Sequence, residues 1–163
     1  MLGAITGDVV GSVYEWNNIK HKDFKPLFSP RSFFTDDSVL TVALMDAIDR
    51  SVDYGKTMHW YYTQHPHAGY GHRFHHWCKY QSDQSYNSWG NGSAMRTSAV
   101  GYAYDTIEDV LEKAKYFASF THDHPEGIKG AQATSACIFM ARKGATKEAI
   151  RTYISKQFEY DLD

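Results

Sequence analysis

Thr35-Asp36-Asp37-Ser38 stands directly before an apolar run and brings two adjacent carboxylates and two hydroxyls to one point of the chain. From Val39 to Ile48 the apolar residues recur three and four positions apart, which predicts a helix. Polar residues at such a place cap the helix and complement its dipole. The same oxygens are the ligands that Mg²⁺ and Mn²⁺ prefer. The tetrapeptide thus admits two interpretations, a helix cap and part of a metal site, and the local pattern alone favours the cap.

Helical patterns extend on both sides of this stretch, and the sequence contains no strand-like alternation of any length. Apolar residues at helical spacing predict further helices over residues 2–16, 106–117, 126–143 and 146–158. A loop is expected over 17–34, where two prolines interrupt the pattern. We therefore predict an all-α fold.

The composition excludes several classes of protein. A chain of 163 residues, 42% of them hydrophobic, predicts a single domain over residues 1–163. Its net charge of −2, without a basic cluster, argues against nucleic acid or an anionic membrane as the main partner. Two cysteines, Cys78 and Cys137, are too few for a disulfide framework and indicate the cytoplasm. We expect no secretory signal and no membrane-spanning helix.

The predicted helix over 2–16 has a glycine at every fourth position, namely Gly3, Gly7 and Gly11. Each glycine inside a helix costs about 1 kcal/mol relative to alanine, so three on one stripe indicate close approach of a neighbouring backbone or ligand. We therefore expect this helix to be central.

Polar residues occupy another face of the same helix. Asp8, Ser12 and Glu15 are spaced four and three residues apart, so they share one side. That side is either a solvated stripe or part of a site, and the spacing does not distinguish the two.

The segment 58–78 is rich in histidine and aromatic residues. Imidazole and thiolate are ligands of zinc, but neither a Cys-x-x-Cys nor a His-Glu-x-x-His spacing is present. An aromatic-rich helix and loop is the favoured interpretation.

Residues 87–96 include the sequence Gly90-Asn91-Gly92. Glycines on both sides of an asparagine allow positive φ angles, and successive backbone N–H groups then point at one anion. The alternative is an ordinary Asn-Gly turn between two elements, which the local pattern favours.

Together these segments resemble the ADP-ribosylglycohydrolase family, the relatives of dinitrogenase reductase-activating glycohydrolase. The resemblance rests on five segments in the family's order: Gly3-Ala4-Ile5-Thr6-Gly7-Asp8-Val9-Val10-Gly11-Ser12-Val13-Tyr14-Glu15, Thr35-Asp36-Asp37-Ser38, Gly69-Tyr70-Gly71, Gly90-Asn91-Gly92-Ser93-Ala94-Met95-Arg96 and Thr121-His122-Asp123-His124-Pro125-Glu126-Gly127-Ile128-Lys129-Gly130-Ala131. Each segment is modest alone, and the ordered set is specific.

The resemblance implies an orthogonal helical bundle that binds two Mg²⁺ or Mn²⁺ ions and hydrolyses the glycosidic bond between ADP-ribose and an acceptor, such as a protein side chain. It makes Thr35, Asp36 and Asp37 metal ligands, and Glu15 and Asp36 the catalytic residues. The substrate-binding residues that it implies are Ser88, Trp89, Gly90, Asn91, Gly92, Ser93 and His122.

The family also carries a second acidic cluster of the Gly-Asp-x-Asp-Thr type, which this sequence lacks before its last residues, Tyr160-Asp161-Leu162-Asp163. We therefore expect an incomplete domain, the N-terminal three-fifths of a family member, whose activity alone is weak or absent. The alternatives are a module that binds ADP-ribose without hydrolysing it, and a truncated product that needs a homo-oligomer or a complementing chain. The acceptor and the choice between Mg²⁺ and Mn²⁺ stay open.

Overall fold

The computed structural model describes residues 1–162, and all regular structure within that range is helical. The all-α prediction is therefore confirmed. In chain order the helices are α1 (Leu2–Gly11), the 3₁₀ turn η1 (Ser12–Tyr14), α2 (Asp36–Asp49), α3 (Tyr54–Gln64), α4 (His72–Lys79), α5 (Gly92–Arg96), α6 (Ser98–Ala103), α7 (Ile107–Ala118), α8 (Pro125–Arg142) and α9 (Lys147–Phe158).

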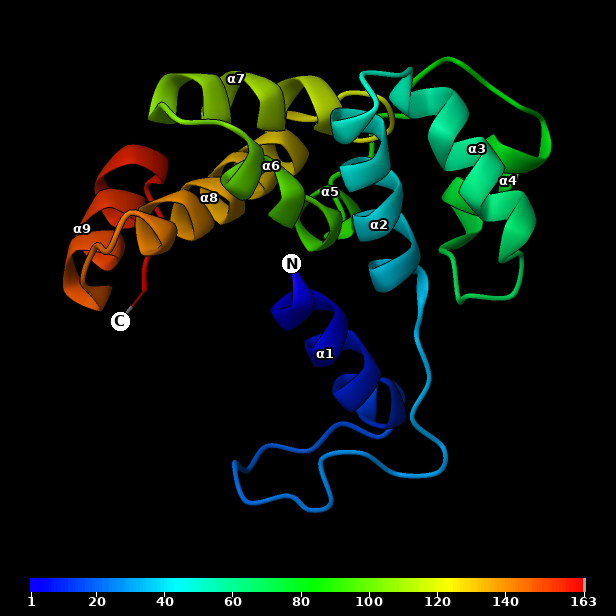
Figure 1. The fold of residues 1–163 in the computed structure, drawn as a ribbon, viewed down its shortest axis with the longest axis horizontal. Coiled ribbons are helices and arrows are strands. Elements are labelled where there is room, and N and C mark those ends of the chain that lie inside the picture. Colours follow the sequence, from blue (N-terminus) through cyan, green and yellow to red (C-terminus); the bar gives the residue numbers. More distant parts are fainter. Residues whose placement is uncertain (163) are drawn as a thin grey trace.

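The helices form a body and an arm (Figure 1). In the body, which we define as residues 35–162, α2 stands in the middle, with α3 and α4 on one side and α5 to α9 on the other. The arm, residues 1–34, consists of α1, η1 and the long loop, and it extends away from the other helices. Any site at the start of α2 therefore lies where the arm meets the body.

The packing of α2 fixes the start of this helix in space. Its cap is Thr35, whose hydroxyl accepts a hydrogen bond from the Asp37 N–H at 3.3 Å. Leu40, Ala43 and Leu44 are at most 1% exposed and pack in the main core with residues of α3, α4, α6 and α7. Burying one leucine side chain contributes on the order of 2 kcal/mol, so the helix is held firmly in the body.

The long helix α8 is the second axis of the body, because α5, α6, α7 and α9 all pack against it. Contact with α6 is close: a Cβ added to Gly101 would lie 2.7 Å from the Ile138 side chain. The short α5 precedes α6 directly, so this packing also positions the loop over 87–91 that leads into α5.

The expectation that the first helix is central is wrong. No residue of α1 is buried, Leu2 is 81% exposed, and a Cβ added to Gly3, Gly7 or Gly11 would meet no atom within 4 Å. The physical reason is that, within residues 1–162, α1 packs mainly on α2, and no second helix lies opposite its glycine stripe.

Candidate active site

An acidic corner lies where the arm meets the body, and we use this name for Asp8, Glu15, Thr35, Asp36 and Asp37. Asp8 of α1 joins the two parts, because its carboxylate accepts hydrogen bonds from the Thr35 N–H at 2.8 Å and the Thr35 hydroxyl at 2.6 Å. Thr35 is only 5% exposed. Asp8 therefore ties its side of α1 to the start of α2.

Like charges crowd the acidic corner. Burial, followed by the neighbouring Asp37, raises the pKa of Asp36 to about 7. The pKa of Asp37 is also raised, first by burial and then by Asp8. Glu15 is exposed, yet its charge lies close enough to raise both pKa values. A cation at this corner would relieve the repulsion.

The donor set fits a hard divalent cation in its chemistry. Carboxylate and hydroxyl oxygens suit Mg²⁺ and Mn²⁺. In residues 1–162, however, no group of three or more His, Cys, Asp or Glu side chains is arranged to hold a metal ion. Mg²⁺ commonly keeps several waters and takes one or two carboxylates from the protein, so Asp36 and Asp37 would supply only part of its coordination shell.

A cavity of about 290 Å³ begins at Asp36 and runs into the body; we call it the loop cavity. This volume lies near the lower end for small-molecule sites and gives room for part of a nucleotide. Its walls come from α2, from residues 71–74 at the start of α4, from the segment 86–96 and from His122. Asp36 therefore belongs to both the acidic corner and the loop cavity.

The loop of the cavity is held by close packing rather than by positive φ angles. Neither Gly90 nor Gly92 has a positive φ, whereas Asn87 has a φ of 51°. Gly92 is needed for another reason, because a Cβ there would lie 2.9 Å from the ring of His122. The Ser93 hydroxyl donates to the backbone carbonyl of Gly127 at 2.7 Å. Of the two interpretations of this segment, the glycine nest with positive φ angles is not formed, and the loop packs on His122 and on the first turn of α8.

Cationic side chains set the charge of the loop cavity. Arg96 is 1% exposed, donates to the Thr121 hydroxyl at 2.7 Å, and keeps its Nη1 buried without a partner. Burial, with Arg96 and then Arg73, lowers the pKa of His122 to about 3. A buried cation without a counter-charge makes the cavity favourable for an anion.

Most of the residues expected to bind substrate line this cavity, and two do not. Ser88, Gly90, Asn91, Gly92 and His122 form part of its wall. The two exceptions are Trp89, which is 71% exposed beside the ring of His124, and Ser93, which is 2% exposed beneath the loop.

Three residues near the site were not among those that the resemblance implied. They are Asp8, Arg96 and Tyr70, whose buried hydroxyl has no partner and whose pKa is raised by burial and by Asp36. Gly69, at a φ of +92°, turns the chain past Asp36, whose N–H donates to the Ala68 carbonyl at 2.6 Å. No local sequence signal marks Arg96 as buried, because it follows a glycine-rich loop and precedes Thr97 and Ser98.

The histidine-rich segment has a structural arrangement of its own. His59 stacks on Trp77 at 4.1 Å between ring centroids, and Nδ1 of His75 lies 2.7 Å from the Tyr62 hydroxyl. These side chains tie α3 to α4, which is consistent with the aromatic-rich interpretation.

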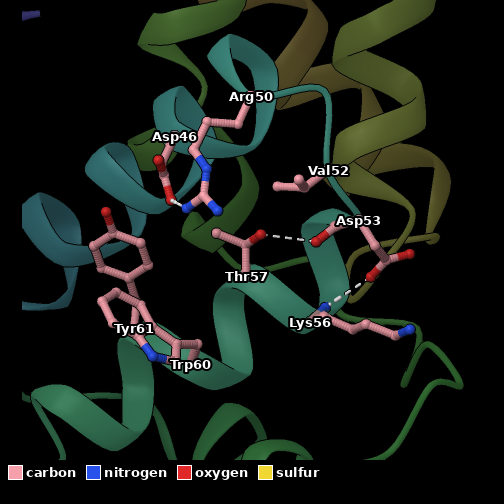
Figure 2. A pocket seen from close by; sticks show the side chains of 8 residues that line it. All are labelled: Asp46, Arg50, Val52, Asp53, Lys56, Thr57, Trp60 and Tyr61. Carbon is pink, nitrogen blue, oxygen red and sulfur yellow. Dashed lines mark hydrogen bonds and ion pairs between the residues drawn. The ribbon is translucent and has the colours of Figure 1, made fainter.

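A separate cavity of about 540 Å³ lies along α3, at the end of α2 remote from the acidic corner (Figure 2). Arg50 lines this cavity, and its guanidinium is paired with the Asp46 carboxylate at 3.2 Å. The guanidinium of Arg50 therefore already has a counter-charge, unlike that of Arg96.

None of the described helices has the length and apolar character needed to cross a membrane.

Comparison with known proteins identifies related sequences. A family model described as ADP-ribosylglycohydrolase matches residues 1–161. The ADP-ribosylhydrolase ARH3 of Mus musculus is 28% identical over 181 residues, which cover 90% of this chain and 49% of the mouse protein. The proteins of the same name from Homo sapiens and Xenopus tropicalis are 27% and 24% identical, each over 88% of this chain and 49% of the relative. The chain thus spans about half the length of these curated relatives, somewhat less than the three-fifths expected from the sequence.

Proposed function

The chain belongs to the ADP-ribosylglycohydrolase family, and from this premise we propose that it binds ADP-ribose and takes part in hydrolysing the glycosidic bond to an acceptor, with Mg²⁺ or Mn²⁺ as cofactor. One observation carries the proposal: Asp36 belongs both to a corner of crowded carboxylates and to a cavity with a buried, unpaired arginine. The crowded carboxylates of the corner favour a cation, and the buried guanidinium of the cavity favours an anion. ADP-ribose with a divalent cation supplies both.

The residues divide the work by their chemistry. Thr35, Asp36 and Asp37 would hold the cation, which when bound orients ribose hydroxyls and lowers the pKa of a bound water. Arg96 and His122 would hold the diphosphate and the adjoining ribose in the loop cavity. Nδ1 of the neutral His122 imidazole lies 2.8 Å from the Thr121 hydroxyl, which leaves Nε2 to form a hydrogen bond with a ribose hydroxyl.

Glycoside hydrolysis needs a water and a carboxylate beside the anomeric carbon, because the transition state resembles an oxocarbenium ion. We assign the carboxylate role to Glu15, at the exposed edge of the acidic corner. In this assignment one water adds to the anomeric carbon as the bond to the acceptor breaks. Glu15 accepts one proton of that water and passes it on to the departing acceptor, so the products are free ADP-ribose and the unmodified acceptor. The exposed position gives water direct access to this group.

The test is the release of free ADP-ribose from peptides that carry ADP-ribose on serine or on arginine, measured by chromatography with Mn²⁺, with Mg²⁺ and with chelator. We expect release that depends on the metal and falls at least about 100-fold in Glu15→Gln, within the range of a general-base contribution. Lys115→Gln, on the exposed side of α7, is the matched control.

Binding of ADP-ribose without any release would instead support the non-catalytic module. If the chain neither binds ADP-ribose nor releases it from the peptides, the proposed function is contradicted.

The cytoplasmic location is part of the same proposal, and it is supported by the fact that Cys78 and Cys137 are both free thiols.

A further inference from the structure

Asp8 makes more contacts than a surface acid of a helix needs. Besides the two hydrogen bonds from Thr35, its Oδ2 accepts one from the Ser38 N–H at 3.2 Å and one from the Ser38 hydroxyl at 2.5 Å. A single carboxylate of the arm therefore receives four donors from the first turn of α2. Its two oxygens have different partners, since only Oδ1 faces the Thr35 hydroxyl.

The Thr35 hydroxyl has one proton and two lone pairs. Its oxygen lies 2.6 Å from Asp8 Oδ1 and 3.4 Å from Asp37 Oδ2, so the proton is directed to Asp8. One lone pair accepts the Asp37 N–H at 3.3 Å. The second lone pair stays free.

From this geometry we propose that Asp8 is a positioning residue: it holds the Thr35 proton away from the acidic corner and thereby leaves a hydroxyl lone pair for the cation. The inference rests on the proposed function for the identity of that cation. Without Asp8, the nearest carboxylate acceptor for the proton is Asp37 Oδ2. The hydroxyl would then use up a carboxylate oxygen and turn its hydrogen toward the place of the ion.

Asp8→Asn is a sharp test, because the amide is nearly isosteric with the carboxylate. Its nitrogen cannot replace Oδ2, which faces only donors of Thr35 and Ser38. The nitrogen therefore takes the position of Oδ1 and donates to the Thr35 hydroxyl, which reverses the hydrogen bond and turns the hydroxyl proton outward. The backbone caps from Thr35 and Ser38 keep their oxygen acceptor.

Ser38→Ala is the matched control for the capping role. It removes one of the four hydrogen bonds to Asp8 but leaves the bond to the Thr35 hydroxyl in place. Mn²⁺ binding to the full chain is measured from the loss of the free-ion electron paramagnetic resonance signal. We expect Asp8→Asn to weaken Mn²⁺ binding by about tenfold, as loss of an outer hydrogen-bond partner commonly does. Thr35→Val, which removes the hydroxyl ligand itself, should weaken it at least as much, and Ser38→Ala by less than about twofold.

The double variant Asp8→Asn/Thr35→Val decides between positioning and simple loss of charge. If Asp8 acts through the Thr35 hydroxyl, the double variant binds Mn²⁺ no more weakly than Thr35→Val alone. Effects that multiply, or an Asp8→Asn variant that binds Mn²⁺ like the wild type, would overturn the inference while leaving the proposed function intact. A wild-type chain that takes up no Mn²⁺ would overturn both the cation role of Asp8 and the metal part of the proposed function.

A measurement without metal tests the coupling between Asp8 and Thr35 by itself. In urea unfolding, Asp8→Asn and Thr35→Val should be strongly non-additive, because the first reverses and the second removes the same hydrogen bond. Asp8→Asn and Val42→Ala, a partly exposed position farther along α2, should add. Additivity of the Asp8 and Thr35 changes would overturn the proposed hydrogen bond, whatever the metal measurements give.

Discussion

The acidic corner and the loop cavity meet at Asp36, yet their electrostatics are opposite. In the corner, crowded carboxylates and burial raise the pKa of Asp36 to about 7. In the cavity, burial and two arginines lower the pKa of His122 to about 3. Each region therefore disfavours the charge of its own ionisable group. The two regions therefore favour counter-ions of opposite sign, which one anionic ligand bound together with one divalent cation can supply.

The largest effect is expected from Arg96→Met, which removes the buried positive charge of the cavity. Affinity for ADP-ribose should fall about 100-fold, since a hydrogen bond to a charged group contributes about 1.5–3 kcal/mol. Affinity for adenosine, which has no diphosphate, should stay within about twofold. Calorimetry with both ligands measures this contrast.

Stability provides the control for the Arg96 prediction. Arg96→Met removes the hydrogen bond to the Thr121 hydroxyl and the contact over the Tyr54 ring, but it also removes the desolvation cost of a buried charge. These effects oppose each other, so the free energy of unfolding in urea should change by no more than about 1 kcal/mol. An equal loss of affinity for ADP-ribose and adenosine would mean that Arg96 supports the shape of the cavity rather than its charge.

A smaller effect is expected from Gly92→Ala, which tests whether the loop depends on close packing. The added Cβ would lie 2.9 Å from the His122 ring, so the ring or the loop must shift. We expect ADP-ribose affinity to fall about tenfold and stability to fall by about 1–2 kcal/mol, as in other overpacked sites. Gly90→Ala is the control, because its Cβ would lie an ordinary 3.7 Å from the Ser88 hydroxyl. Equal effects of the two substitutions would count against the packing of the loop on His122.

The protonation of His122 should make stability depend on pH. His122 stays neutral in the folded chain at pH values where the unfolded chain binds a proton, below the ordinary histidine pKa of about 6.5. The contribution of His122 to the free energy of unfolding is therefore fully present above pH 6.5 and is lost as the pH falls toward 3. Between pH 6 and 5 we expect wild type to lose about 1 kcal/mol relative to His122→Gln, a difference in which the carboxylates cancel.

Two measurements check the His122 prediction. Unfolding free energies of both chains against pH give the relative slope, and an NMR titration of the imidazole should show a neutral ring at pH 5. A ring that takes up a proton near pH 6.5 would remove the electrostatic contrast between cavity and corner.

The smallest effect is expected from Asp37→Asn, whose effect on the stability of the chain should reverse when Mn²⁺ is added. Without divalent cations, Asp37→Asn should stabilise the chain by about 0.5 kcal/mol, because it relieves repulsion in a partly solvated group. With saturating Mn²⁺ the wild type should be the more stable chain. Thermal unfolding at both conditions tests this, with Asp49→Asn at the far end of α2 as a control that Mn²⁺ leaves unchanged.

Local signals allowed much of the fold to be predicted from the sequence. Thr35, Thr106 and Thr146 each cap a helix where a capping residue stands before an apolar run. Capping depends on neighbouring residues alone, so one sequence suffices to find it. The central position expected for α1 was wrong, because a glycine stripe indicates that close approach is possible and not that a neighbour is present.

The site was predicted less completely, for reasons of packing. The spacing of Asp8 does not distinguish a solvated residue from one with partners, and only the return of the chain at Thr35 gives it hydrogen bonds. Arg96 follows a glycine-rich loop, where an exposed arginine is the ordinary expectation, and its burial results from the packing of α5 on α8 and α2. The positive φ that Gly90 and Gly92 would allow occurs instead at Asn87. Contacts between distant segments decide all of these features.

Calorimetric titration of the full chain with ADP-ribose, with saturating Mn²⁺ and with chelator, tests most directly whether the acidic corner and the loop cavity form one site. We expect Mn²⁺ to tighten ADP-ribose binding by about tenfold, and ADP-ribose to tighten Mn²⁺ binding by the same factor, as linkage requires. ADP-ribose binding of equal strength in both conditions would contradict a single site, and no binding in either would contradict the cavity's role altogether.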